Sequence, residues 1–122
     1  MRQTYYTYII SNPKRTVLYT GITNNIARRL IEHYLNRGDE KTFAGRYYCY
    51  YLLYVQEFNY VNDAIWFEKQ IKRQTRKWKL NLIKEMNPAL KSMNEMFVGV
   101  WPPSVSMIEE ITGKPHDSTK VE

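Results

Sequence analysis

The sequence predicts a small α+β domain in which helices flank a three-stranded, mainly antiparallel sheet, in the order β-β-α-β-α-α. Three observations predict this fold. Residues 4–10 and 16–22 are two short stretches of β-branched and aromatic residues, separated by five turn-forming residues. A third such stretch covers residues 50–58. The segments that follow the second and third stretches carry apolar residues at helical spacing.

The first two stretches are predicted to pair as a hairpin. Residues 11–15, Ser-Asn-Pro-Lys-Arg, have the composition of a turn and a length that suits an antiparallel connection. Side chains alternate between the two faces of a strand, so Tyr8 shares a face with Tyr6 and Ile10, and Tyr19 shares one with Gly21. Depending on the register, the two phenols come close to each other.

Three helices are expected in the rest of the domain. Thr23 or Asn24 can cap the first helix, which ends before Gly38. Residues 39–47 are polar and are expected to form a loop. Asn62 and Asp63 open the second helix, and a third, basic helix ends before Pro88 because proline disfavours its continuation. In the first helix the apolar positions at helical spacing are Ile26, Leu30 and Ile31. The second helix is expected to carry Ala64, Ile65, Phe67 and Ile71 inward, and the third carries Trp78, Leu80, Leu82 and Ile83.

Length and composition indicate one folded unit. The 122 residues are near the usual size of a single domain. We expect this domain to occupy residues 1–96, followed by a C-terminal appendage at 97–122. The appendage is expected to contain a short helix near 106–111 and to be disordered from about Gly113. One cysteine and two histidines argue against a disulfide framework and a structural zinc site.

No segment suggests contact with a membrane. The N-terminus lacks the long apolar run of a signal peptide, and no apolar stretch approaches the roughly 18 residues of a membrane span. A soluble, cytoplasmic protein is therefore expected. The sequence does not indicate its oligomeric state.

The charge distribution predicts a polyanionic partner. The net charge is +6, and the segment from Lys69 to Lys84 holds seven basic residues and no acid. Clustered cations favour nucleic acid because neutralising phosphates releases their counterions. For a charge run taken alone, a solvated helix face is the alternative.

A carboxylate stands among the apolar positions of the second helix. On a helix, Glu68 shares a face with Ala64, Ile65 and Ile71. Burying an unpaired carboxylate costs several kcal/mol, so Glu68 needs a cation, a hydrogen-bond donor or a bound metal. A salt bridge to a nearby arginine is the purely structural alternative.

Arg29 and His33 are one turn apart on the first helix and therefore project from one face. The planar guanidinium of arginine suits a phosphate, because it donates bidentate hydrogen bonds and stays charged. His33 can shuttle a proton or hydrogen-bond a phenol. Taken separately, a helical arginine is more often a surface residue and a helical histidine a packed one. A phenol is a poor base unless cations or a metal lower its pKa.

Several motifs together resemble the signature of the GIY-YIG nuclease family. They are Tyr6-Thr7-Tyr8, then Tyr19-Thr20-Gly21, then residues 23–33, 68–72 and finally Asn87-Pro88. The resemblance covers about residues 4 to 93 and is closest to short, stand-alone bacterial members. The chain differs from the family pattern at Tyr6, Thr20 and Phe67 and at Arg73-Gln74, none of which is a presumed reacting residue.

The resemblance implies a metal-dependent endonuclease that hydrolyses DNA phosphodiester bonds by direct water attack, in DNA repair or recombination. It implies that Tyr8 and Tyr19 position and deprotonate the water, and leaves open which of them is the base. Arg29 matches the arginine that stabilises the pentavalent phosphate, and His33 matches a frequent His or Tyr. Glu68 matches the acid that binds a single divalent ion, Mg²⁺ or Mn²⁺.

The resemblance also implies supporting positions and a substrate. Gly21 belongs to the second motif, and Asn87 matches a late polar position near the site. The expected partner is DNA, with branched or damaged DNA among the candidates, and RNA is not distinguished. The side chains expected to hold the flanking backbone are Arg46, Lys69, Lys72, Arg73, Arg76, Lys77 and Lys79.

Two alternatives to a nuclease remain open. The first is a nucleic-acid-binding module with the same fold and little or no turnover, because a basic surface works without catalysis. A protein-interaction domain that uses the Trp101-Pro102-Pro103 segment has less support in the sequence.

Overall fold

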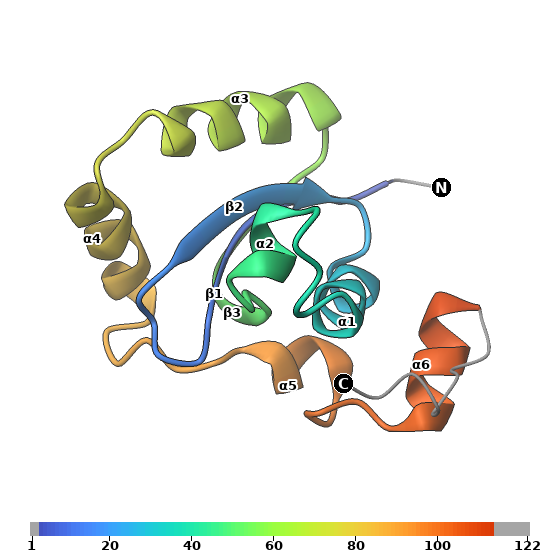
Figure 1. The fold of residues 1–122 in the computed structure, drawn as a ribbon. Helices are drawn as coiled ribbons and strands as arrows, with labels where there is room; N and C mark the ends of the chain where they lie inside the picture. The colour runs from blue at the N-terminus through green and yellow to red at the C-terminus, as the bar shows by residue number, and fades with distance from the viewer. Residues whose placement is uncertain (1–2, 114–122) are drawn as a thin grey trace.

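The computed structural model describes residues 3–113 and has an α+β fold (Figure 1). Its elements are β1 (Tyr5–Ser11), β2 (Leu18–Thr23), α1 (Ile26–Leu35), α2 (Phe43–Arg46), β3 (Tyr51–Phe58), α3 (Val61–Lys72), α4 (Arg76–Met86), α5 (Asn94–Val98) and α6 (Val105–Thr112).

The three strands form one antiparallel sheet in the order β2-β1-β3, which confirms the predicted fold class. The central strand β1 places Tyr8 opposite Gly21 of β2 and opposite Val55 of β3. Tyr19 lies opposite Ile10, two residues along. Because alternate residues face the same way, Tyr8 and Tyr19 are on one face of the sheet.

Asn12 fixes the turn that sets this register. Its Oδ1 accepts hydrogen bonds from the backbone nitrogens of Thr16 at 2.8 Å and Val17 at 2.9 Å. Its Nδ2 donates to Thr16 Oγ1 at 2.7 Å. Arg15 has a left-handed backbone with φ 60°, and its nitrogen closes the turn on the Asn12 carbonyl at 3.0 Å. One side chain thereby holds the loop whose geometry aligns the two tyrosines.

Helices cover both faces of the sheet (Figure 1). On the face of Tyr8 and Ile10, the core includes Leu30 and Ile31 of α1. On the opposite face, Ile9 packs with apolar side chains of α3 and α4, including Ile71 and Ile83. Thr7 also faces α3 and its Oγ1 donates to the Ala64 carbonyl at 2.8 Å. The sheet is therefore the middle layer, and α1 and α3 approach it from different sides.

The helix starts differ from those expected. Asn25, rather than Thr23 or Asn24, caps α1, and its Oδ1 accepts from Arg28 N at 3.0 Å. Helix α3 begins at Val61 without a side-chain cap, so Asn62 and Asp63 lie in its first turn. Both differences are of one or two residues. At α1 several neighbouring polar side chains can serve as the cap, whereas no side chain fills that role at α3.

Two short helices interrupt segments without helical periodicity. Helix α2 lies inside the region 39–47, where a loop was expected, and begins after Thr42, whose Oγ1 accepts from Gly45 N at 3.0 Å. Helix α5 was not predicted either. Helices of four or five residues are too short to show a periodic apolar pattern, so tertiary contacts decide whether they form.

The C-terminal segment packs against the sheet domain. Val98 of α5 and Ile108 of α6 are buried in the same core cluster as Leu30 of α1. Residue 96, where the sequence analysis ends the domain, lies inside α5. The helix expected near 106–111 is α6, which ends at Gly113 with φ 71°. The disorder expected beyond that point concerns residues outside the described range.

Asn94 attaches this segment to the outer edge of β3. Its side chain is fully buried, accepts a hydrogen bond from Leu52 N at 2.7 Å, and donates one to the Tyr50 carbonyl at 2.8 Å. Beside it, Met93 N donates to the Leu52 carbonyl at 2.9 Å. The segment thus covers backbone groups that an edge strand would otherwise expose.

Among residues 3–113, each helix is too short or too polar to cross a lipid bilayer.

Replacing Asn94 with alanine should destabilise the fold. Leu52 N and the Tyr50 carbonyl would lose their buried partner, which should lower the free energy of unfolding by roughly 2–4 kcal/mol. Urea denaturation followed by circular dichroism measures this loss. The control is Asn81→Ala at an exposed position of α4, which should change stability by less than about 0.5 kcal/mol. Equal effects of the two substitutions would contradict the role assigned to Asn94.

Candidate active site

A chain of hydrogen bonds joins the sheet to helix α1. Arg29 Nε donates to the Tyr8 hydroxyl at 3.3 Å, and the Tyr8 hydroxyl lies 2.8 Å from His33 Nε2. An arginine nitrogen can only donate, so the Tyr8 oxygen accepts from Arg29. The Tyr8 hydroxyl donates to His33 Nε2 when the imidazole hydrogen is on Nδ1, and accepts from Nε2 in the other tautomer. The helical spacing of Arg29 and His33 brings both to one phenol.

Gly21 makes room for this phenol. A Cβ atom at Gly21 would lie 2.5 Å from the Tyr8 hydroxyl oxygen and 2.7 Å from the adjoining ring carbon. It would also lie 3.2 Å from a ring carbon of Tyr19. Glycine is the residue that leaves space above β2 for the Tyr8 side chain to lie across it. The supporting role expected for Gly21 thus has a direct steric basis.

Burial sets the protonation states of the pair. It raises the pKa of Tyr8 to about 12, although the Arg29 charge opposes the shift. It lowers the pKa of His33 to about 3, and the Arg29 charge adds to that effect. At neutral pH Tyr8 is therefore a phenol and His33 a neutral imidazole. The Tyr8 oxygen becomes a base only if its own proton moves to another group.

Tyr19 completes the aromatic wall of the site. Its ring lies 5.7 Å from the His33 ring in an edge-on arrangement, as does the Tyr8 ring at 5.8 Å. Tyr8 is 1 % exposed, whereas Tyr19 is only partly buried. The two tyrosines expected to act together therefore flank one imidazole, and Tyr19 is the one nearer to solvent.

Glu68 approaches the same group from helix α3. Its charge contributes to the raised pKa of Tyr8, after the effects of burial, Arg29 and Tyr19. Its side chain is 17 % exposed and forms an ion pair with Lys72 at 3.3 Å, one helical turn on. The counter-ion is thus a lysine of its own helix rather than an arginine. A guanidinium and a carboxylate, carried on different sides of the sheet, both act on one phenol.

Glu32 is a further neighbour of Arg29 and is not among the site residues predicted from the sequence. Its carboxylate accepts from Arg29 Nη1 at 3.2 Å and from Arg28 Nε at 3.3 Å. It therefore restrains Arg29 through a second guanidinium nitrogen, while Nε bonds Tyr8. The sequence spacing could have predicted this contact, because an acid three residues after an arginine on a helix lies beside it.

The donor set limits how a metal could bind. Within residues 3–113, no group of three or more His, Cys, Asp and Glu side chains is arranged to hold a metal. A single carboxylate fits Mg²⁺, which keeps several waters and binds through one or two carboxylates together with substrate phosphates. Lys72 is half exposed, so its ammonium group can leave Glu68 without unpacking the core.

The basic side chains expected to contact DNA lie mainly on α3 and α4. Six of these seven side chains are exposed, and Lys79 is half-buried. Arg76 uses one guanidinium nitrogen to bond the Arg15 carbonyl at 3.0 Å. Arg46 is exposed on α2, apart from the others in sequence, and bonds the Glu40 carbonyl at 3.0 Å. Those exposed at α3 and α4 are Lys69, Lys72, Arg73, Arg76 and Lys77.

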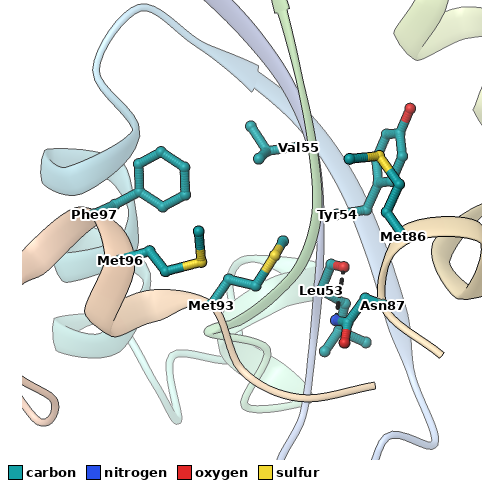
Figure 2. A pocket seen from close by; sticks show the side chains of 8 residues that line it. All are labelled: Leu53, Tyr54, Val55, Met86, Asn87, Met93, Met96 and Phe97. Carbon is teal, nitrogen blue, oxygen red and sulfur yellow. Dashed lines mark hydrogen bonds between the residues drawn. The ribbon is translucent and has the colours of Figure 1, made fainter. Parts of the chain in front are cut away.

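Asn87 is not among the residues gathered around Tyr8. Its Nδ2 donates to the Leu53 carbonyl at 3.1 Å and to the Lys91 carbonyl at 2.9 Å, and its Oδ1 accepts from Lys91 N at 3.0 Å. Figure 2 shows Asn87 in an apolar pocket that includes Met93 and Phe97. This pocket lies at β3, whereas Gly21 and Tyr19 belong to β2 at the other edge of the sheet. Asn87 fixes the chain after α4 to the sheet.

Comparison with known proteins identifies the family. A model of the GIY-YIG catalytic domain matches residues 4–81, which include β1, β2, α1 and α3 with all the side chains around Tyr8. The chain belongs to the GIY-YIG family. GIY-YIG domains are nuclease domains that generally use a divalent metal ion, so the family connects the site described above with nucleic acid as a substrate.

Curated relatives carry the same domain. The chain is 33 % identical to a UPF0213 protein from Limosilactobacillus reuteri over 62 % of its own length and 77 % of the relative's. It is 34 % identical to a UPF0213 protein from Pediococcus acidilactici, over 66 % and 81 % of the two chains. These names specify no reaction.

A solved structure is also similar. The solution NMR structure of a UPF0213 protein from Bacillus halodurans is 22 % identical, with a TM-score of 0.46, over 83 % of this chain and 99 % of that one.

The neutral His33 of this GIY-YIG domain predicts a loss of stability in acid. The folded-state pKa is about 3 and the ordinary value 6.5, so below pH 6.5 the unfolded chain binds one more proton than the folded chain. The free energy of unfolding should then fall by up to about 1.4 kcal/mol per pH unit toward pH 3, with no such dependence above 6.5.

The matched control is His33→Gln, which keeps a hydrogen-bonding side chain but does not titrate. Urea denaturation of both proteins between about pH 7 and pH 4.5 separates this effect from that of the carboxylates, which both share. The wild type should lose stability faster than the variant. Parallel curves would mean that His33 is not held neutral.

Proposed function

We propose that this chain is a metal-dependent endonuclease that hydrolyses DNA phosphodiester bonds by direct attack of water. One observation carries the proposal. The Tyr8 hydroxyl is hydrogen-bonded to Arg29 and His33 and lies within range of the Glu68 charge. An isolated phenol needs none of these groups to pack, whereas phosphodiester hydrolysis needs a cation, a proton acceptor and a metal-binding acid together.

Arg29 supports the proposal as the phosphate-binding group. Its guanidinium is partly buried between Tyr8 and Glu32, so its orientation is fixed before a substrate arrives. A pre-oriented guanidinium stabilises the negative charge that develops on the phosphate during attack, at little cost in reorganisation. We assign this role to Arg29 rather than to its exposed neighbour Arg28.

Glu68 would hold the divalent ion. Mg²⁺ or Mn²⁺ would bind the Glu68 carboxylate in place of Lys72, with water and the substrate phosphate as further ligands. When bound, the ion polarises the phosphate as a Lewis acid. The remaining chemistry belongs to the side chains of the chain itself.

Proton movement follows from the hydrogen-bond chain. Tyr8 and Tyr19 flank the position of the attacking water. Tyr8 can accept a proton from the water only as it passes its own hydrogen to His33 Nε2, 2.8 Å away. The water oxygen then forms a bond to phosphorus, and the P–O bond to the leaving oxygen breaks with its electron pair going to that oxygen. The leaving oxygen takes a proton from solvent, and His33 returns its extra proton to solvent. This relay uses the His33 tautomer whose resting hydrogen is on Nδ1. Tyr19 is the alternative base, because it is the less buried phenol.

The substrate proposed is DNA, in the setting of DNA repair or recombination. The basic side chains of α3 and α4 would hold its backbone through phosphate contacts, which add affinity without reading the sequence. The second candidate is a module that binds DNA with little turnover. The ion pair of Glu68 with Lys72 favours it, because this pair satisfies the carboxylate without a metal.

Cleavage assays with point variants test the nuclease. Supercoiled plasmid incubated with the protein and Mg²⁺ should be nicked, and Glu68→Gln or Arg29→Ala should slow nicking about 100-fold or more, since each removes a charge needed at the phosphate. The matched controls are Glu95→Gln, exposed on α5, and Arg28→Ala, which removes the other partner of Glu32. Both controls should stay within about twofold of the wild type.

Two outcomes would contradict the proposal. Nicking that survives both site substitutions would assign the activity to another site or to a contaminant. A wild-type protein that shifts DNA in a gel but does not cleave it with Mg²⁺ or Mn²⁺ would favour the binding module. Unfolding curves of each variant exclude loss of fold as the reason for lost cleavage.

A further inference from the structure

A row of aromatic rings leads from the candidate active site to the protein surface. The Tyr19 ring lies 6.1 Å from the Phe43 ring, with an angle of 25° between the ring planes. The Phe43 ring in turn lies 4.9 Å from the Tyr47 ring. Phe43 is 49 % exposed and Tyr47 is 42 % exposed. The rings of α2 and its C-cap thus continue the aromatic wall that begins at His33.

The fold does not depend on the exposed parts of these rings. Ala44 and Cys49 are buried and anchor the segment in the core, and Cys49 N donates to the Ala44 carbonyl at 2.9 Å. Gly38 N donates to the Gly45 carbonyl at 2.8 Å, and Thr42 caps the helix. Contacts other than ring packing therefore hold the segment in place, and the two rings are presented in a fixed position.

We propose that Phe43 and Tyr47 stack against an unpaired nucleobase beside the phosphate that is cleaved, so that the substrate is DNA with single-stranded nucleotides at the cut. This inference rests on the proposed nuclease function, because it takes the phosphate to lie next to Tyr19. An unpaired base offers a free aromatic face, whereas in a duplex both faces are covered by neighbouring base pairs.

The absence of a net charge around α2 indicates that this segment contributes to DNA binding by stacking rather than by phosphate contacts. The exposed cations Lys41 and Arg46 are balanced by Asp39 and Glu40 in the same stretch of chain. A segment without net charge adds little to phosphate binding, whereas stacking of a base on an aromatic ring is a short-range contact that salt does not screen. The α2 segment should therefore select the form of the substrate, while the basic run on α3 and α4 supplies affinity.

Binding without cleavage tests the stacking surface directly. The protein is Glu68→Gln in the presence of EDTA, and the probes are a labelled single-stranded oligonucleotide and the duplex of the same sequence, followed by fluorescence anisotropy. Two further substitutions in this protein, Phe43→Ala together with Tyr47→Ala (the alanine pair), should weaken single-strand binding about tenfold. Duplex binding should weaken by less than about twofold. The slope of affinity against salt concentration should stay unchanged, because no phosphate contact is lost.

Two further variants separate stacking from general effects. Phe43→Trp should retain single-strand binding, and its fluorescence should be quenched when the oligonucleotide binds. Tyr60→Ala removes a ring that is 70 % exposed ahead of α3 and should leave both affinities unchanged. Equal weakening of single-strand and duplex binding by the alanine pair, or no weakening of either, would overturn the stacking proposal.

Cleavage by the wild type distinguishes this inference from the nuclease proposal. If the nuclease proposal and the stacking proposal both hold, a duplex with unpaired nucleotides is cut faster than the fully paired one, and the alanine pair removes the difference. If the wild type cuts both substrates equally, the stacking proposal fails and the nuclease proposal stands. If nothing is cut but single-strand binding still depends on Phe43, the nuclease proposal fails.

Discussion

The Tyr8 hydroxyl, buried between the central strand and helix α1, is the group on which the rest of the site depends. It accepts a hydrogen bond from Arg29 and is hydrogen-bonded to His33, so one oxygen atom fixes the positions of a cation and an imidazole. This arrangement requires the opposite position on β2 to be glycine, because a Cβ atom there would collide with the phenol. A constraint on the backbone of an edge strand thus decides whether the polar site can form.

Two charged groups of the site each have an oppositely charged side chain beside them. Arg29 is paired with Glu32, and Glu68 with Lys72, and the four side chains are between one sixth and one half exposed. Such pairs contribute little to stability at a partly exposed site but keep the charged groups oriented. Under the proposed function, a phosphate would take the place of Glu32 beside Arg29, and a divalent ion would take that of Lys72 beside Glu68. His33 is neutral, so no second positive charge lies beside Arg29.

Different elements around the site support different parts of it. Helices α5 and α6 add Val98 and Ile108 to the core below α1 and thereby support the helix that carries Arg29 and His33. The α2 segment lies next to Tyr19 and forms the outer part of the aromatic wall. Residues far from the hydrogen-bond chain, such as Asn94 and Asn87, satisfy backbone groups along β3 instead.

The sequence alone determined the strands, the three long helices and the placement of Arg29 and His33 on one helix face, because these depend on local spacing. Alternation in a strand fixes the faces of Tyr8 and Tyr19, and a single helical turn joins Arg29 to His33. Only the tertiary structure decided that Lys72 pairs with Glu68, that the Asn87 side chain hydrogen-bonds to backbone groups, and that the Phe43 ring lies next to Tyr19. Those contacts depend on side-chain choice among several neighbours or join segments distant along the chain, and no period of two or 3.6 residues encodes them.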